Sequence, residues 1–182
     1  ARPVSDWVKT SISSENISKD GAEAITIASN DPGKIATLIL PADTAWGKAK
    51  DIITAEQALP REKVNKDNIL NIAKILTNGN HSTLVLGGQA LNESCIELAG
   101  RIAAKTGCGI ITESANSRLS RGAGRVQMLR IPGAGVVDRA IDMVGKAGQL
   151  ILVGAKPPVA FFGYPNKPSL LEQKPKLGMF FS

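Results

Sequence analysis

The chain has 182 residues, of which 43% are hydrophobic and 21% are charged. These fractions are typical of a globular protein and exclude a disordered or fibrous class, and the length suffices for one well-buried domain or one domain plus part of another. No apolar run approaches the roughly 20 residues that cross a bilayer, so we expect no membrane partner. The net charge of +6 is spread over many segments, and stacking aromatic residues do not alternate with the basic ones. We therefore expect no nucleic-acid partner.

The two cysteines and the first residue bear on the cellular context. Cys95 and Cys108 belong to no CxxC pair and to no Cys/His cluster with metal spacing, which favours small buried side chains of a reduced, intracellular protein over a disulfide. The chain starts at Ala1 without a signal-peptide pattern, so we expect it to begin inside a longer chain. We expect a cytoplasmic protein, and organellar targeting stays open because the true N-terminus would lie upstream.

Residues 1–46 predict a partial α/β segment. We expect a short helix over 4–10, a second helix over 17–30 after the N-cap candidates at 13–16, and a strand over 34–40. The inner face of the second helix is expected to carry Ile17, Ala24, Ile25 and Ala28. A helix and one strand cannot bury both faces of that strand, so this segment is interpreted as the end of a preceding domain.

Residues 47–63 are polar and contain a proline, as in an interdomain linker. From residue 64 onwards, helical and strand patterns alternate, which predicts an α/β fold with a doubly wound parallel sheet. We expect helices over 68–78, 91–106 and 136–144, and strands over 82–86, 109–112, 127–131 and 149–153. A further strand could begin within 176–182, where the sheet would be left incomplete.

The stretch STLVLGGQAL at 82–91 is the centre of the predicted sheet. An apolar strand stops at Gly87-Gly88, and Leu91, Cys95, Leu98 and Ile102 then recur at helical spacing, which places them on one face. Ligands of parallel sheets bind beyond the carboxyl ends of the strands, where helix N-termini attract anions. This turn is therefore our first candidate for a nucleotide or phosphate site, and a purely structural turn is the alternative.

Three other features could contribute to a site. The loop from Glu113 to Arg125 carries three arginines and could clamp a phosphate, although a solvated loop is the alternative. The sequence Gly133-Ala-Gly135 matches a dinucleotide fingerprint only in part, since the third glycine is missing, and it is interpreted as an ordinary loop-to-helix junction. The single histidine, His81, is expected at the surface. No catalytic residue and no metal ligand is predicted.

Four stretches together resemble the acetolactate synthase-like family of thiamine diphosphate-dependent enzymes. They are ATLILPADTAW at 36–46, TLVLGGQAL at 83–91, TES…SRLSRGAGR at 112–125 and ILVGAKPPVAFFGYPNKPS at 151–169. The resemblance implies that residues 1–46 are the C-terminal tail of a pyrimidine-binding domain and that 47–63 are a linker. Residues 64–182 would be most of the central domain, which in this family has a Rossmann-like, six-stranded parallel sheet.

The same resemblance implies a nucleotide site. In relatives the central domain sometimes holds FAD or ADP along the carboxyl ends of its strands. The matching positions in this sequence are Gly87, Gly88, Gln89, Thr112, Glu113, Arg118, Gly154 and Ala155.

The resemblance further implies a parent enzyme, a transferase or lyase that joins or cleaves 2-oxo acids with thiamine diphosphate and Mg²⁺, and a homo-oligomer. The family's catalytic glutamate and its Gly-Asp-Gly…Asn segment belong to parts of the enzyme outside these 182 residues. We therefore expect this chain alone to bind neither thiamine diphosphate nor Mg²⁺ and to be inactive. The alternative is a stand-alone nucleotide-binding or subunit-contact module without catalysis.

Overall fold

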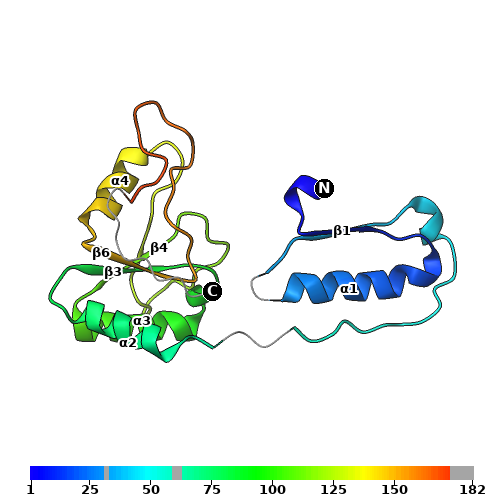
Figure 1. Ribbon diagram of the computed structural model, residues 1–182, viewed down its shortest axis with the longest axis horizontal. Helices are drawn as coiled ribbons and strands as arrows, with labels where there is room; N and C mark the ends of the chain where they lie inside the picture. The colour runs from blue at the N-terminus through cyan, green and yellow to red at the C-terminus, as the bar shows by residue number, and fades with distance from the viewer. Residues whose placement is uncertain (31–32, 59–62, 173–182) are drawn as a thin grey trace. The chain divides into compact units, whose positions relative to one another are not determined.

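The computed structural model describes residues 1–30, 33–58 and 63–172. The chain divides into two compact units, Ala1–Lys63 and Val64–Ser182 (Figure 1). The strand expected within 176–182 lies outside the described residues. Among the described helices, none is both long and apolar enough to cross a membrane.

The first unit is built on a strand–helix–strand motif. Strand β1 (Trp7–Thr10) and strand β2 (Ala36–Ile39) pair in parallel, and helix α1 (Ile17–Ser29) connects them. Short 3₁₀ turns lie at Arg2–Val4, Ser14–Asn16 and Ala42–Ala45. The helix expected over 4–10 is therefore wrong. The β-prone side chains of this stretch pair with a strand that lies far along the sequence, and that pairing overrides the local pattern.

The segment after β2 runs along α1. The backbone N–H of Ile53 donates to Ser18 Oγ at 2.7 Å, and that of Glu56 donates to Thr26 Oγ1 at 3.0 Å. Residues expected to form a polar linker thus hydrogen-bond to the outer side of this helix. The same helix leaves Ile25 57% exposed and Ala28 exposed as well, so the expectation that these two residues face inward is wrong.

The second unit contains a four-stranded parallel sheet in the order β5-β4-β3-β6. The α/β fold and the parallel sheet predicted from the sequence are confirmed, with four of the six expected strands among the described residues. The strands are β3 (Ser82–Leu86), β4 (Gly109–Thr112), β5 (Leu129–Arg130) and β6 (Gln149–Val153). The helices are α2 (Lys66–Leu76), α3 (Glu93–Thr106) and α4 (Val137–Lys146), and a 3₁₀ turn, η4, spans Gly88–Leu91.

Helices cover both faces of this sheet, with α4 on one side and α2 and α3 on the other (Figure 1). Successive residues of a strand point to opposite faces, so β6 supplies both cores. Leu150 and Leu152 pack in the cluster of α4, whereas Ile151 packs in the cluster on the other face. All three are at most 2% exposed, which explains why this strand reads as a continuous apolar run.

Helix α3 meets the sheet through a different face from the one predicted. Its buried residues are Ile96 and Ala99, whereas Leu98 is 53% exposed. The small side chain of Ala99 lets the helix lie close to the strands, and Leu98 instead lines an apolar groove that α2 borders. The prediction of Leu91, Cys95, Leu98 and Ile102 as one buried face is therefore wrong for Leu98 and Ile102, and of the other two only Leu91 is buried. Cys95 is partly buried, so the expectation of two buried cysteines holds for Cys108 alone. Both cysteines of the chain are free thiols.

Candidate functional site

The carboxyl ends of β3, β4 and β6 meet at the Gly87-Gly88 turn. The N–H of Gly87 donates to Val153 O at 3.0 Å, and the N–H of Glu113 donates to Leu86 O at 3.1 Å. A Cβ atom on Gly87 would lie 2.7 Å from Ala155 Cα and 2.7 Å from Glu113 Cδ. The backbones approach so closely here that only glycine fits at position 87.

Gly154 is the counterpart of Gly87 at the end of β6. Its φ is +61°, and a Cβ atom on it would lie 2.7 Å from Gly87 O. The structure thus brings Gly87, Gly154, Ala155 and Glu113 together, and all four were predicted site residues. Gly154 and Ala155 lie behind the turn and support it.

The amides of the turn are arranged differently from the sequence-based expectation. Gly88 has a φ of +47°, and its N–H faces Glu113 Oε1 at 3.4 Å. The turn η4 then intervenes, and α3 begins only at Glu93, where the side chain of Asn92 caps it by accepting from Cys95 N at 2.9 Å. A carboxylate therefore lies at the position expected for a phosphate, and the α3 N-terminus is capped from within the chain.

A cavity of about 440 Å³ opens in front of this turn. Four predicted residues line it, namely Gly88, Gln89, Glu113 and Arg118; the rest of its lining is Leu91, Asn92, Ala115, Asn116 and Ser117. Thr112 lies fully buried beneath it. The cavity thus gathers half of the predicted positions, and Gly87, Thr112, Gly154 and Ala155 form its support.

Asn116 shapes this cavity and was missed from the sequence. Its Nδ2 donates to Thr112 Oγ1 at 3.2 Å and to Glu113 O at 2.9 Å, which folds the loop back over the end of β4. An asparagine four residues after a strand end is a common loop residue, so the sequence held only a weak signal for it.

The polar side chains of the cavity are suited to binding a ligand. Glu113 offers a carboxylate that accepts hydrogen bonds from hydroxyl or amino groups, and Arg118 offers a guanidinium that pairs with one anionic group. Among the described residues, no group of three or more His, Cys, Asp or Glu side chains could hold a metal ion.

The Gly133-Ala-Gly135 stretch is a junction that anchors the aromatic loop. The N–H of Gly135 donates to the hydroxyl of Tyr164 at 3.0 Å. In the first turn of α4, Asp138 pairs with Lys167 Nζ at 2.5 Å. The interpretation as an ordinary loop-to-helix junction agrees with these contacts, and His81 is exposed as predicted.

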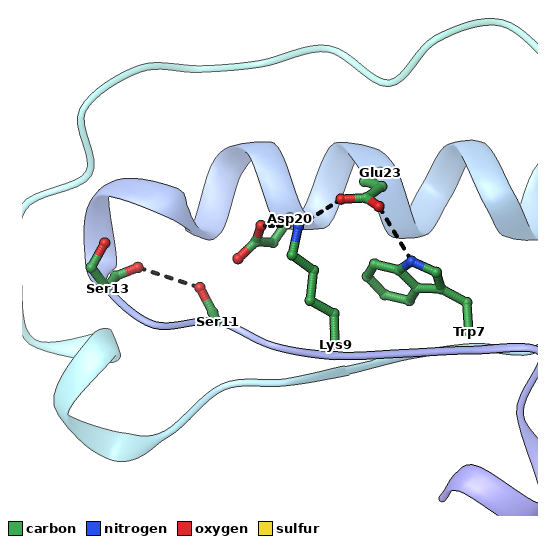
Figure 2. A network of polar contacts seen from close by, with 6 residues as sticks. All are labelled: Trp7, Lys9, Ser11, Ser13, Asp20 and Glu23. Carbon is green, nitrogen blue, oxygen red and sulfur yellow. Dashed lines mark hydrogen bonds and ion pairs between the residues drawn. The ribbon is translucent and has the colours of Figure 1, made fainter.

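A second polar constellation lies in the first unit, between β1 and α1 (Figure 2). Lys9 Nζ lies 2.9 Å from Asp20 Oδ1 and 2.7 Å from Glu23 Oε2, and Trp7 Nε1 donates to Glu23 Oε1 at 3.3 Å. The Asp20 side chain is only 4% exposed. No sequence signal pointed to this group, because its members come from two elements.

This constellation binds β1 to α1 and provides no nucleophile. The hydrogen bonds to Glu23 and Asp20 raise the pKa of Lys9 above its usual value, so the amine stays protonated at neutral pH. A protonated amine has no lone pair with which to attack a substrate. We therefore assign the constellation a structural role.

Comparison with known proteins places the chain in a family. No family model matches it. The chain is 33% identical over 170 residues to a Mycobacterium tuberculosis protein assigned as an acetolactate synthase large subunit, IlvX. The chain belongs to the acetolactate synthase-like family of thiamine diphosphate-dependent enzymes. The match covers 93% of this chain and 32% of the relative, so the chain spans about a third of that protein's length.

Two solved structures share the fold. A thiamin diphosphate-dependent enzyme from Mycobacterium smegmatis superposes with a TM-score of 0.69 at 18% identity, over 97% of this chain and 34% of that one. The thiamine diphosphate-dependent 4-hydroxybenzoylformate decarboxylase of Rhodococcus jostii RHA1 gives a TM-score of 0.63 at 18% identity, over 93% and 32%. Both likenesses extend over nearly all of the present chain.

Proposed function

We propose that this chain is a segment of an acetolactate synthase-like enzyme and carries its central domain. Residues 1–46 would be the tail of the pyrimidine-binding domain, 47–63 the linker and 64–182 the central domain. The whole protein would be a cytoplasmic homo-oligomer, a transferase or lyase that joins or cleaves 2-oxo acids. The relationship to IlvX, with about a third of its length matched, supports this assignment.

The function proposed for the segment itself is to bind FAD or ADP at the carboxyl edge of its sheet. The observation that carries this proposal is the cavity of about 440 Å³ in front of Gly88, with Glu113 and Arg118 in its lining. Its volume lies in the range of about 300–1,000 Å³ that is typical of small-molecule sites. Glu113 would accept from ribose hydroxyls, and Arg118 would pair with a phosphate.

Thiamine diphosphate and Mg²⁺ would be bound by the whole protein. The described residues contain no carboxylate cluster for the metal, so they do not fit the Mg²⁺-diphosphate group. We expect the chain to be inactive alone.

The test is a calorimetric titration of ADP and FAD against the unmutated protein and three folded variants. Arg118→Ala should weaken binding about tenfold to a hundredfold, since a charge-assisted hydrogen bond contributes about 1.5–3 kcal/mol. Gly88→Val should also weaken binding, because Gly88 has a positive φ and a branched side chain there would displace the turn that lines the cavity. Gly135→Val, at the partial fingerprint, should leave binding unchanged. Thiamine diphosphate with Mg²⁺ in the same experiment should show no saturable, Mg²⁺-dependent binding at micromolar concentrations.

If only Gly135→Val lost ADP binding, the nucleotide site would lie at Gly133 and Gly135 and not at the Gly87-Gly88 turn. The alternative function, a subunit-contact module without a ligand, would be favoured if the unmutated protein bound neither ADP nor FAD.

A further inference from the structure

A second cavity lies in the loop between β4 and β5, apart from the one in front of Gly88. It measures about 440 Å³ and is lined by residues of the 119–130 segment. Leu119 and Met128 also pack on the core cluster beneath α3, so they give the cavity an apolar floor. Its volume is in the range of small-molecule sites.

Three arginines line this cavity, namely Arg121, Arg125 and Arg130. The carboxylate of Glu93, on α3, pairs with Arg125. With the residues that the structure describes, neither Arg121 nor Arg130 forms an ion pair. The cavity therefore carries an excess of positive charge, which a bound anion would neutralise.

Two contacts with α3 fix this loop. One is the ion pair between Arg125 and Glu93. The other involves Val126 and Gly100, where a Cβ atom on the glycine would lie 2.5 Å from Val126 Cγ2. The glycine thus lets the loop lie directly on the helix. Arg125 is best regarded as a positioning residue, whereas Arg121 and Arg130 are available to a ligand.

We propose that this cavity binds a small phosphorylated molecule with an apolar part, held by Arg121 and Arg130. Guanidinium groups donate two parallel hydrogen bonds to phosphate oxygens, and two such groups match the double charge of a phosphate monoester better than a monocarboxylate. The apolar part would lie on Leu119 and Met128. This site is independent of the FAD or ADP site, because it shares no lining residue with that cavity.

The experiment is a titration of the full chain with phenyl phosphate at about 0.15 M ionic strength, where exposed charges more than a Debye length apart are largely screened. We expect saturable binding that exceeds the binding of benzoate and phenol. Arg121→Gln and Arg130→Gln should each weaken it about tenfold or more. The matched control is Arg139→Gln, at an exposed position of α4, which should bind as the unmutated protein does. Arg118→Gln, in the other cavity, reports on phenyl phosphate that binds at the FAD or ADP site instead.

Three titration results would overturn the proposal. They are the absence of saturable binding at millimolar concentrations, an equal loss in Arg139→Gln, and a loss in Arg118→Gln that is not seen in Arg121→Gln. A readout on the unmutated protein avoids dependence on variants that fail to fold. Phenyl phosphate should shift the amide resonances of Gly122 and Val126, and unchanged resonances there would also contradict the proposal.

Discussion

At the scale of single residues, Asp20 shows how this chain accommodates a buried charge. The carboxylate is nearly inaccessible and lies 2.9 Å from the ammonium of Lys9. The hydrogen bond from Lys9 lowers the pKa of Asp20 below its usual value, and this effect outweighs burial, which would raise it. Lys9 lowers the pKa of Glu23 in the same way. A carboxyl group whose pKa is lower in the folded state stabilises the fold above its unfolded pKa and loses that effect as the pH falls through the folded pKa.

We predict that Asp20→Asn lowers the stability of the first unit at pH 7 and that the difference from the unmutated protein shrinks below about pH 4. Both tryptophans, Trp7 and Trp46, lie in this unit, so urea unfolding followed by tryptophan fluorescence reports on it selectively. Asp51→Asn, at an exposed position, is the matched control and should unfold like the unmutated protein. A stability difference that persisted unchanged at pH 3 would show that the ion pair is not its cause.

At the scale of elements, the sequence predicted what local composition determines. Continuous apolar runs located β3, β4 and β6, because strands covered on both faces need such runs. Strand β1 was missed, since its partner β2 lies far along the chain and no local pattern shows that pairing.

The sequence likewise predicted only some features of the candidate site. The glycines at the strand ends could be found because close backbone approach requires them. Asn116, the capping by Asn92 and the carboxylate of Glu113 facing Gly88 could not, because each depends on how a loop folds back over the sheet. Side-chain geometry of this kind is set by tertiary contacts.

The junction of β3 with β6 gives a direct test at this scale. Gly87→Ala would place a Cβ atom 2.7 Å from Ala155 Cα, so the two strand ends must separate. Overpacking of this kind typically costs about 1–3 kcal/mol. We predict that circular dichroism will show a loss of this size in the free energy of unfolding of the second unit. The unfolding transition followed by tryptophan fluorescence should not change, because both tryptophans lie in the first unit.

Gly145→Ala is the matched control for Gly87→Ala. It lies on α4 with no atom within 4 Å of the added Cβ, and alanine favours helix by about 1 kcal/mol over glycine. It should be neutral or stabilising. Equal stability of the Gly87→Ala protein and the unmutated protein would contradict the close approach of Gly87 to Ala155 at the ends of β3 and β6.

At the scale of the whole molecule, the two units differ in how well they bury their apolar side chains. The first has only two described strands and exposes large apolar side chains, among them Ile12, Trp46 and Ile52. We propose that other parts of a longer, oligomeric parent cover these side chains. The second has its own core on both faces of the sheet and contains both cavities. We propose that the second unit binds a nucleotide in the cavity in front of the Gly87-Gly88 turn.

Nucleotide binding by the second unit is tested most directly by a nuclear magnetic resonance titration of the ¹⁵N-labelled chain with ADP. Gly88, Gln89 and Arg118 line the proposed cavity, so their amide resonances should show the largest saturable shifts. Resonances of the Gly133–Val136 junction and of the first unit should change little. The largest shifts at Gly133 and Gly135, or no saturable shift anywhere in the second unit, would contradict nucleotide binding at the Gly87-Gly88 turn.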